Sequence, residues 1–339
     1  MKAVGVLEPG KIQVVDIPAP RYGDYECLVR IRACGVCNCT DIEIINDTHV
    51  NQSQSYPLVI GHEGAGEIVE LGKKVKNYRI GDRIVFPEGR IDPESGFCAR
   101  DGQTSEFGIV RDVRAMNADG LDGGDYEKTF PREFPGSISF EDAGVLVPVR
   151  ETFSGMRNLG AAKGSKVLIF GDGPNGLGLS LFARILGADW VGVVGHRKNR
   201  LEHIRDVAKL DLVIDSNEAD PEEVLAGKKL DLVVDGVGKT DIILKGSRMV
   251  REGGKVGLYA GVHKPESLLP LYEFANNVCF HKHFFPSGDL AAHDEVIQMI
   301  LDGKVKPSDF YSHVVPIDDY QKAVDMTLSR EAFKVVVKI

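Results

Sequence analysis

The sequence predicts an α/β protein with two domains, one β-rich and one built on a doubly wound parallel sheet. The chain has 339 residues, more than one ordinary hydrophobic core accommodates. Residues 1–152 contain short alternating apolar and polar segments punctuated by glycines, which is typical of a partly closed barrel. From residue 153, apolar segments alternate with helical patterns, which indicates a parallel sheet covered by helices on both faces.

Within the β-rich part, strands are expected over 26–36, 65–72 and 81–89, and polar, glycine-rich loops over 88–107 and 117–140. After residue 286 the pattern changes to two amphipathic helices and a closing apolar strand, "FKVVVKI". We expect that strand to pair back with the N-terminal part. The predicted domains are therefore 1–152 with 287–339, and 153–286.

Composition and charge exclude several classes of protein. Apolar residues make up 43% and charged residues 27%, as in an ordinary globular protein. The formal net charge of −9 argues against a nucleic-acid binder, which would show a basic face. No apolar run approaches the roughly 20 residues that span a bilayer, and the first residues lack the apolar segment of a signal peptide. We therefore expect a cytoplasmic protein with no membrane partner.

The segment "VLIFGDGPNGLG" carries a dinucleotide-binding pattern. Gly171, Gly173 and Gly176 have G-x-G-x-x-G spacing, with Pro174 and Asn175 between the last two. The first glycine allows a tight turn, the second allows a pyrophosphate to approach the backbone, and the third allows close packing of helix on strand. The pattern follows an apolar strand and opens a helical segment, which is the context that this interpretation requires.

The next strand, "WVGVV", indicates which dinucleotide is bound. An NAD site places an acidic residue at its end, about 20 residues beyond the glycines, to bind the ribose hydroxyl. Here the strand ends in Gly195, His196, Arg197 and Lys198. A small residue followed by cations leaves room and charge for a 2′-phosphate, so NADP is favoured and NAD stays possible. The alternative is that these residues only form the solvated start of a helix.

The segment "RACGVCNCTD" places Cys34, Cys37 and Cys39 within six residues of a chain that has six cysteines. A disulfide is disfavoured by the tight spacing and the reducing compartment, and a structural metal knuckle needs about four such ligands. His62 and Glu63 lie in a turn between two predicted strands. Zinc accepts thiolate, imidazole and carboxylate together, so Cys37, His62 and Glu63 are candidate ligands of one catalytic zinc. Cys34 fits a small buried residue on a strand.

These motifs, in their order along the chain, resemble the zinc-dependent medium-chain alcohol dehydrogenases, in the polyol and sugar dehydrogenase branch. The matching segments are "CGVC..TD", "GHEGAGEIVELG", "GDRI", "GDGPNGLG" and "FKVVVKI". The resemblance implies a GroES-like catalytic domain split around a Rossmann domain. It also implies that Cys37, His62 and Glu63 bind the catalytic zinc, and that Thr40 is the hydroxyl near the substrate oxygen.

Three departures from the family pattern concern the site. "CNCTD" is one residue longer than the usual segment, so either Cys39 or Thr40 takes the proton-relay place; Thr40 is favoured because its hydroxyl both accepts and donates. Val147 stands where the family often supplies a further ligand, and Glu151 is an alternative one helical turn on. Cys98 alone represents the four-cysteine structural zinc lobe, so one zinc at most is expected per chain.

The resemblance implies reversible oxidation of a secondary alcohol, such as a polyol or sugar, by hydride transfer to NADP, in a homodimer or homotetramer. The polar segment 46–56 suits a hydroxylated substrate or is an ordinary solvated loop, and Arg150 and Glu151 either bind a polar substrate or pair with each other. One rival is a zinc-free medium-chain reductase of a carbon–carbon double bond or a quinone. Another is a non-catalytic NADP-binding protein.

Overall fold

The structure is a computed structural model that describes residues 1–48, 55–261, 268–283 and 285–339. The chain forms two compact units, which are described separately below. Unit 1 contains Met1–Val147 and His293–Ile339, and unit 2 contains Pro148–Ala292. The boundaries at 152/153 and 286/287 stay a prediction about the catalytic and cofactor-binding domains.

Unit 1 is built on two sheets. A four-stranded sheet has the order β2-β1-β4-β7, and a seven-stranded sheet has the order β16-β17-β3-β5-β6-β9 with β8 paired to β3. The strands are β1 Lys2–Glu8, β2 Lys11–Asp16, β3 Glu26–Gly35, β4 Leu58–Val59, β5 Gly64–Leu71, β6 Arg83–Val85, β7 Cys98–Ala99, β8 Phe107–Arg111, β9 Arg132–Glu133, β16 His313–Pro316 and β17 Val335–Lys338.

Short helices connect these strands. The α-helices are α1 Thr40–Ile45, α2 Val113–Ala118, α3 Phe140–Ala143, α9 His293–Leu301 and α10 Tyr320–Leu328, and the 3₁₀ helices are η1 Pro93–Ser95, η2 Tyr126–Lys128, η5 Pro307–Phe310 and η6 Ile317–Asp319. The two segments expected as loops, 88–107 and 117–140, contain little regular structure beyond η1, η2 and the two-residue strands β7 and β9. Their many glycines and polar residues explain this, because neither periodicity of an amphipathic element is sustained.

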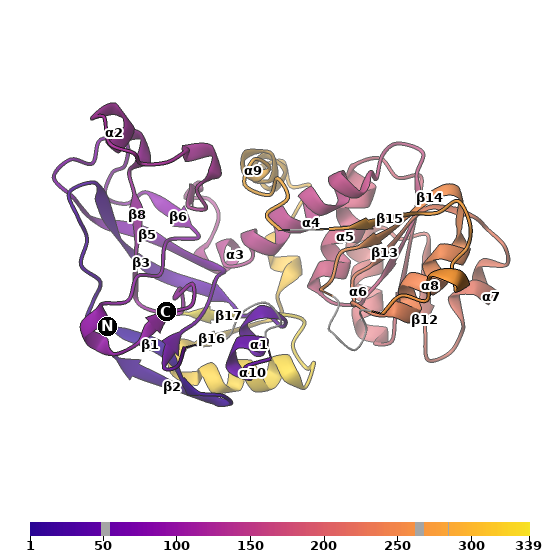
Figure 1. Ribbon diagram of the computed structural model, residues 1–339, viewed down its shortest axis with the longest axis horizontal. Coiled ribbons are helices and arrows are strands. Elements are labelled where there is room, and N and C mark those ends of the chain that lie inside the picture. The colour runs from indigo at the N-terminus through magenta and orange to yellow at the C-terminus, as the bar shows by residue number, and fades with distance from the viewer. Residues whose placement is uncertain (49–54, 262–267, 284) are drawn as a thin grey trace. The chain divides into compact units, whose positions relative to one another are not determined.

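The closing strand β17 returns to the N-terminal part of the chain, as predicted. Val336 and Val337 pair antiparallel with Gly35 and Cys34 of β3, and Figure 1 shows β17 in yellow beside the violet β3. Val335, Val336 and Val337 are fully buried. Because β3 leads directly into the cysteine segment, the C-terminus of the chain helps to fix the candidate site.

Unit 2 contains a parallel six-stranded sheet of order β12-β11-β10-β13-β14-β15. This is the order expected for a dinucleotide-binding fold, in which the crevice lies between the first and fourth strands along the chain, here β10 and β13. The fold class predicted from the sequence is therefore confirmed. Its elements are α4 Leu146–Leu159, which begins in unit 1, β10 Lys166–Phe170, α5 Pro174–Ile185, β11 Trp190–Gly195, α6 Lys198–Ala208, β12 Leu212–Asp215, α7 Pro221–Leu225, β13 Leu230–Asp235, α8 Thr240–Met249, β14 Val250–Leu258, η4 Leu271–Glu273 and β15 Cys279–Lys282.

One helix of unit 2 ends earlier than its sequence suggests. The segment 242–253 has a helical pattern, yet α8 ends at Met249 and β14 begins at Val250. Val250 is buried and pairs with Leu230 of β13. The sheet therefore captures a segment whose local preference is helical, because tertiary packing overrides propensity. No helix in the described part of the chain is long and apolar enough to cross a membrane.

Candidate metal and cofactor sites

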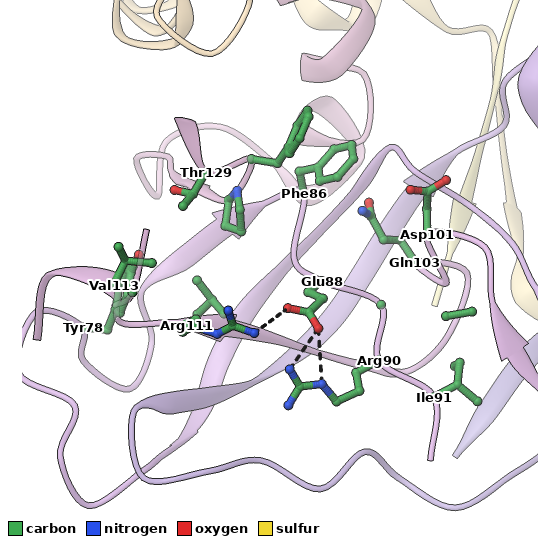
Figure 2. A pocket seen from close by; sticks show the side chains of 16 residues that line it. Tyr78, Phe86, Glu88, Arg90, Ile91, Asp101, Gln103, Arg111, Val113 and Thr129 are labelled. Atoms are coloured by element: carbon green, nitrogen blue, oxygen red, sulfur yellow. Dashed lines mark hydrogen bonds and ion pairs between the residues drawn. The ribbon is translucent and has the colours of Figure 1, made fainter. Parts of the chain in front are cut away.

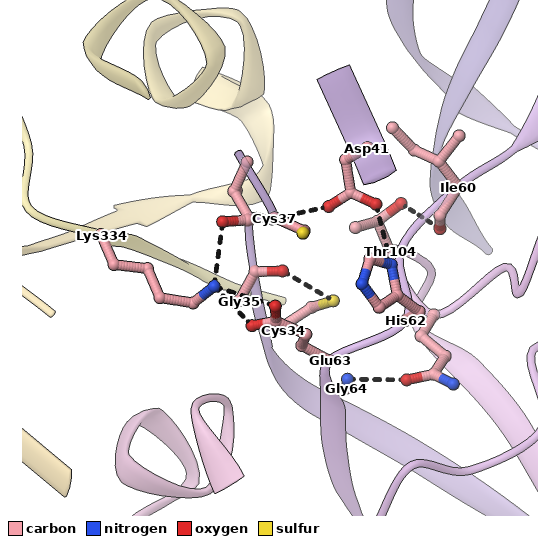
Figure 3. Close-up of polar contacts among 12 residues, drawn as sticks. Cys34, Gly35, Cys37, Asp41, Ile60, His62, Glu63, Gly64, Thr104 and Lys334 are labelled. Atoms are coloured by element: carbon pink, nitrogen blue, oxygen red, sulfur yellow. Dashed lines mark hydrogen bonds and ion pairs between the residues drawn. The ribbon is translucent and has the colours of Figure 1, made fainter. Parts of the chain in front are cut away.

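The three predicted metal ligands converge in unit 1. One ligand atom each from Cys37, His62 and Glu63 lies within 4.8 Å of the other two. Cys37 follows β3 and precedes α1, and the His-Glu pair directly precedes β5, which is paired with β3. The antiparallel pairing of these two strands thus brings the thiol and the His-Glu turn together (Figure 3). Among the described residues, this is the one group of three or more such side chains with this geometry.

A buried carboxylate orients the imidazole. Asp41 is fully buried, and its Oδ1 lies 3.1 Å from His62 Nδ1 while its Oδ2 accepts a hydrogen bond from Cys37 N at 2.9 Å. A carboxylate only accepts, so we assign the hydrogen to Nδ1, which leaves the lone pair of His62 Nε2 for a cation. Burial lowers the pKa of His62, but Asp41 and Cys37 together raise it well above its usual value, so a cation that binds Nε2 has to displace a proton there. An outer carboxylate of this kind commonly fixes a metal-binding histidine.

Glu63 has a second partner besides the cluster. Lys334 Nζ donates to Glu63 Oε1 at 2.9 Å and to Val36 O at 3.1 Å, and lies 2.7 Å from Glu63 Oε2. Oε2 is within ion-pair distance of Lys334, yet it is buried and accepts no well-aligned hydrogen bond. Burial lowers the pKa of Lys334, but Glu63 and Cys37 outweigh this and raise it. Glu63 therefore keeps one oxygen that a cation can coordinate.

Gly35 makes room for this arrangement. A Cβ at this position would lie 2.3 Å from Glu63 Oε2 and 2.4 Å from the carbonyl oxygen of Gly144. Real Cβ atoms do not approach other atoms so closely, so any side chain here would displace the Glu63 carboxylate. Glycine is therefore required in "ACGVC", because a side chain at this position would collide with Glu63.

The donor set fits zinc. A thiolate, an imidazole and a carboxylate are all accepted zinc ligands, and a three-residue protein set leaves a position for substrate or water. Glu63 Oε2 accepts no well-aligned hydrogen bond, so it can still coordinate a cation. Val147, which stands where the family often has a further ligand, is buried in an apolar cluster with Ala65, Val85 and Leu146. Glu151 belongs to unit 2, and a role for it as a further ligand stays a prediction.

The two other cysteines of the segment lie apart from this set of ligands. Cys34 is fully buried on β3, as expected, and its thiol lies 3.6 Å from Gly35 O. Cys39 is exposed, and its thiol lies 3.1 Å from Glu43 Oε1. Thr40 is half-buried and begins α1. All six cysteines are free thiols.

The predicted cofactor residues lie at the carboxyl ends of β10 and β11 in unit 2. Gly171 follows β10 with φ of 134°, and Gly173 precedes α5 with open space where a Cβ would be. A Cβ on Gly176 would lie 2.0 Å from the carbonyl oxygen of Gly171. The three glycines thus have the backbone geometry that the motif requires. Pro174 begins α5, and Asn175 is exposed in its first turn.

The turn after β11 carries the predicted 2′-phosphate residues. Gly195 ends β11, Arg197 precedes α6, and Lys198 is the first residue of α6. His196 and Lys198 are exposed, whereas Arg197 is half-buried. The side chain of Lys198 lies 2.6 Å from Glu218 Oε1. The structure thus brings these residues to one turn, but Lys198 already has an acidic partner.

Unit 1 also contains a cavity of about 550 Å³, in the segments that were expected as loops. Figure 2 shows Glu88 between Arg90 and Arg111 in its wall, and Phe86 at one side. Glu88 is paired with Arg90 at 2.9 Å and lies 3.7 Å from Arg111. Both arginines of the wall therefore already have an acidic partner.

Sequence reasoning missed two residues of the candidate metal site. Asp41 was not predicted, because Cys37 precedes α1 and no helical period relates the two residues. Lys334 has no sequence signal either, because only the register of β17 against β3 brings it to Glu63. The loop 46–56 falls partly outside the described residues, since 49–54 are not among them.

Comparisons with known proteins agree with this architecture. Residues 23–130 match the alcohol dehydrogenase GroES-like domain family. D-arabinitol dehydrogenase 1 of Uromyces fabae is 26% identical over 100% of this chain and 97% of its own length. Sorbitol dehydrogenase of Ovis aries is 24% identical over 97% of this chain and 94% of its own. The crystal structure of 2R,3R-butanediol dehydrogenase from Bacillus subtilis covers 100% of this chain and 99% of its own, with a TM-score of 0.81 at 18% identity, which shows a shared fold.

The GroES-like domain match and these relatives agree with the two sheets of unit 1 and the dinucleotide-type sheet of unit 2. Along nearly its whole length, the chain is similar to alcohol and polyol dehydrogenases.

Proposed function

We propose that this protein is an oxidoreductase that interconverts a secondary alcohol and a carbonyl compound, with a nicotinamide cofactor as hydride carrier. The observation that carries the proposal is the convergence of Cys37, His62 and Glu63 within 4.8 Å, with Asp41 behind the imidazole. Relatives named for arabinitol and sorbitol support a small polyol or sugar alcohol as the substrate.

We propose that Cys37, His62 and Glu63 hold one catalytic zinc. When bound there, zinc would supply Lewis-acid polarisation of the substrate oxygen and lower the pKa of the alcohol. Asp41 keeps His62 in the tautomer and orientation that leave Nε2 free. Lys334 donates a hydrogen bond to Glu63 Oε1 and lies at ion-pair distance from Oε2, so the carboxylate stays near the thiol.

Thr40 is proposed to move the proton of the substrate hydroxyl. Its hydroxyl both accepts and donates, and it begins the helix that follows Cys37. Cys39 is less suited, because its thiol faces Glu43 and is a weak donor. The proposed cofactor is NADP, with NAD possible, because the turn after β11 ends in a glycine followed by Arg197 and Lys198.

The test is a screen of polyols, sugars and secondary alcohols with NADP and NAD in parallel, with and without added zinc. We expect zinc-dependent alcohol oxidation, lost in a Cys37→Ala, His62→Ala double variant and kept in Cys98→Ala, which alters an exposed cysteine outside the cluster. Full turnover by the double variant would contradict the proposal.

Other outcomes identify the rival functions. A protein that holds no zinc, is insensitive to chelators and reduces quinones or activated double bonds is a zinc-free reductase. A protein that binds NADPH but turns over no alcohol or carbonyl across the panel is a cofactor-binding protein without this activity.

A further inference from the structure

A buried carboxylate lies under the turn that was assigned to the 2′ group of the cofactor. Asp172 stands between the first two glycines of the motif and is only 6% exposed. Its Oδ2 accepts hydrogen bonds from His196 N at 2.9 Å and Arg197 N at 3.0 Å. Its Oδ1 accepts one from Arg197 Nη1 at 3.1 Å. The turn after β11 is therefore held from below by a residue of the turn after β10.

Asp172 also occupies the space that a side chain at the end of β11 would need. A Cβ on Gly195 would lie 2.6 Å from the Cβ of Asp172 and 3.0 Å from its Oδ2. In NAD sites the acidic residue stands at the end of this second strand. Here the position is a glycine, and a carboxylate from the neighbouring turn lies beside it. Although β11 ends without an acidic residue, the Asp172 carboxylate places a negative charge at this position.

The positive charges of the turn are already partly balanced. Burial raises the pKa of Asp172, but its hydrogen bonds and the nearby His196 and Arg197 outweigh this and lower it, so the group carries a negative charge at neutral pH. Lys198 has its own acidic partner in Glu218. Arg197 donates one of its five N–H groups to Asp172, which leaves donors for a ligand.

We propose that Asp172 is a specificity-determining residue that limits the preference for NADP over NAD by holding Arg197. A 2′-phosphate that binds Arg197 has to share this side chain with the Asp172 carboxylate. The phosphate is also repelled by the negative charge of that carboxylate. A ribose 2′-hydroxyl carries no charge and is little affected. The inference rests on the proposed binding of a nicotinamide cofactor, but it does not depend on zinc or on the identity of the alcohol.

The test is Asp172→Asn, with separate fluorescence titrations of NADPH and NADH and the ratio of their dissociation constants as the readout. We expect the preference to move toward NADPH by about tenfold at low salt, because one negative charge is removed close to the phosphate, and by less at high salt. A purely structural role of Asp172 would weaken both cofactors together and leave the ratio unchanged.

Asp211→Asn is the matched control. Asp211 also accepts from a backbone N–H, Val191 N at 2.8 Å, and pairs with an arginine, Arg184. It does so at the opposite end of β11, so the ratio is expected to stay within about twofold of the wild type. A wild type that binds neither cofactor would refute the proposed function itself, which separates that failure from a failure of this inference.

A second variant keeps the test decisive if Asp172→Asn folds poorly. Arg197 is partly exposed, so Arg197→Gln is expected to fold, and it should move the preference toward NADH. In the double variant, the shift caused by Asp172→Asn should be clearly smaller, because the part that acts through Arg197 is lost. An unchanged ratio in either single variant, a shift of Asp172→Asn toward NADH, or the same shift without Arg197 would overturn the proposal.

Discussion

At the scale of single residues, a buried carboxylate connects two of the three candidate metal ligands of unit 1. Asp41 bonds both the imidazole of His62 and the backbone of Cys37, so one side chain sets the direction of two ligands. The sequence could predict these three candidate ligands, because zinc accepts thiolate, imidazole and carboxylate donors together. It could not predict Lys334, because that contact depends on a strand register formed between distant parts of the chain.

Asp41→Asn tests this orienting role. Asparagine can present its amide group to Nδ1, which changes the tautomer and weakens the ligand, so we expect the affinity for zinc to fall by about 10–100-fold. The measurement is a competition titration against a coloured chelator. Asp318→Asn, at an exposed ion pair with Lys2, serves as the control. Equal affinity in Asp41→Asn and wild type would show that Asp41 does not orient His62 for a metal.

At the scale of elements, helix caps and strand pairing determine where helices and strands begin and end when local propensity alone does not. The glycine motif, the buried strands and the amphipathic helices α9 and α10 could be predicted, because each has a period or a fixed spacing. The end of α8 could not, because Val250 joins β14 only when β13 is beside it. The helix α2 was also missed, since it lies among polar loop residues and is held by its cap.

That cap gives a pH-dependent prediction. Asp112 is fully buried and accepts hydrogen bonds from Ala115 N, Lys76 N, Asn77 N and Asn77 Nδ2. Burial raises the pKa of Asp112, but these hydrogen bonds outweigh burial and lower it. The folded pKa is below the unfolded one, so the unfolded chain binds more protons in this range. The stability from Asp112 is therefore fully present above the unfolded pKa and is lost as the pH falls through the folded pKa.

Asp112→Asn should reduce the free energy of unfolding at pH 7 by about 1–3 kcal/mol, because an amide cannot accept all four bonds. The difference from the wild type should shrink as the pH falls below about 4, where the aspartate of the unfolded wild-type chain becomes protonated. Urea unfolding at several pH values measures it. A difference that stays constant between pH 7 and pH 3 would contradict this account of the cap.

At the scale of the whole molecule, the last strand of the chain joins a sheet formed by the N-terminal part of unit 1. β17 pairs with β3, and Lys334, which precedes β17, binds Glu63. The return of the closing strand could be predicted from its apolar pattern, and the similarity to alcohol and polyol dehydrogenases from the order of the motifs. The charge balance of the turn after β11 could not, because Asp172 and Gly195 meet only through the parallel pairing of β10 and β11.

Val337→Asp tests the dependence of the metal site on β17. Val337 is fully buried and pairs with Cys34, so a charge there disrupts the sheet that leads to Cys37. We expect loss of bound zinc while the binding of the nicotinamide cofactor by unit 2 persists. Val314→Asp on the adjacent strand β16 is the control, because Val314 is 44% exposed. Full zinc content in Val337→Asp would contradict the dependence.

X-ray absorption at the zinc edge of the purified protein tests the central claim most directly. The account predicts one zinc per chain, with one sulfur ligand at about 2.3 Å and nitrogen or oxygen ligands at about 2.0–2.2 Å. The sulfur signal should vanish in Cys37→Ala and persist in Cys39→Ala. A protein without zinc after reconstitution, or a zinc with no sulfur neighbour, would contradict the account.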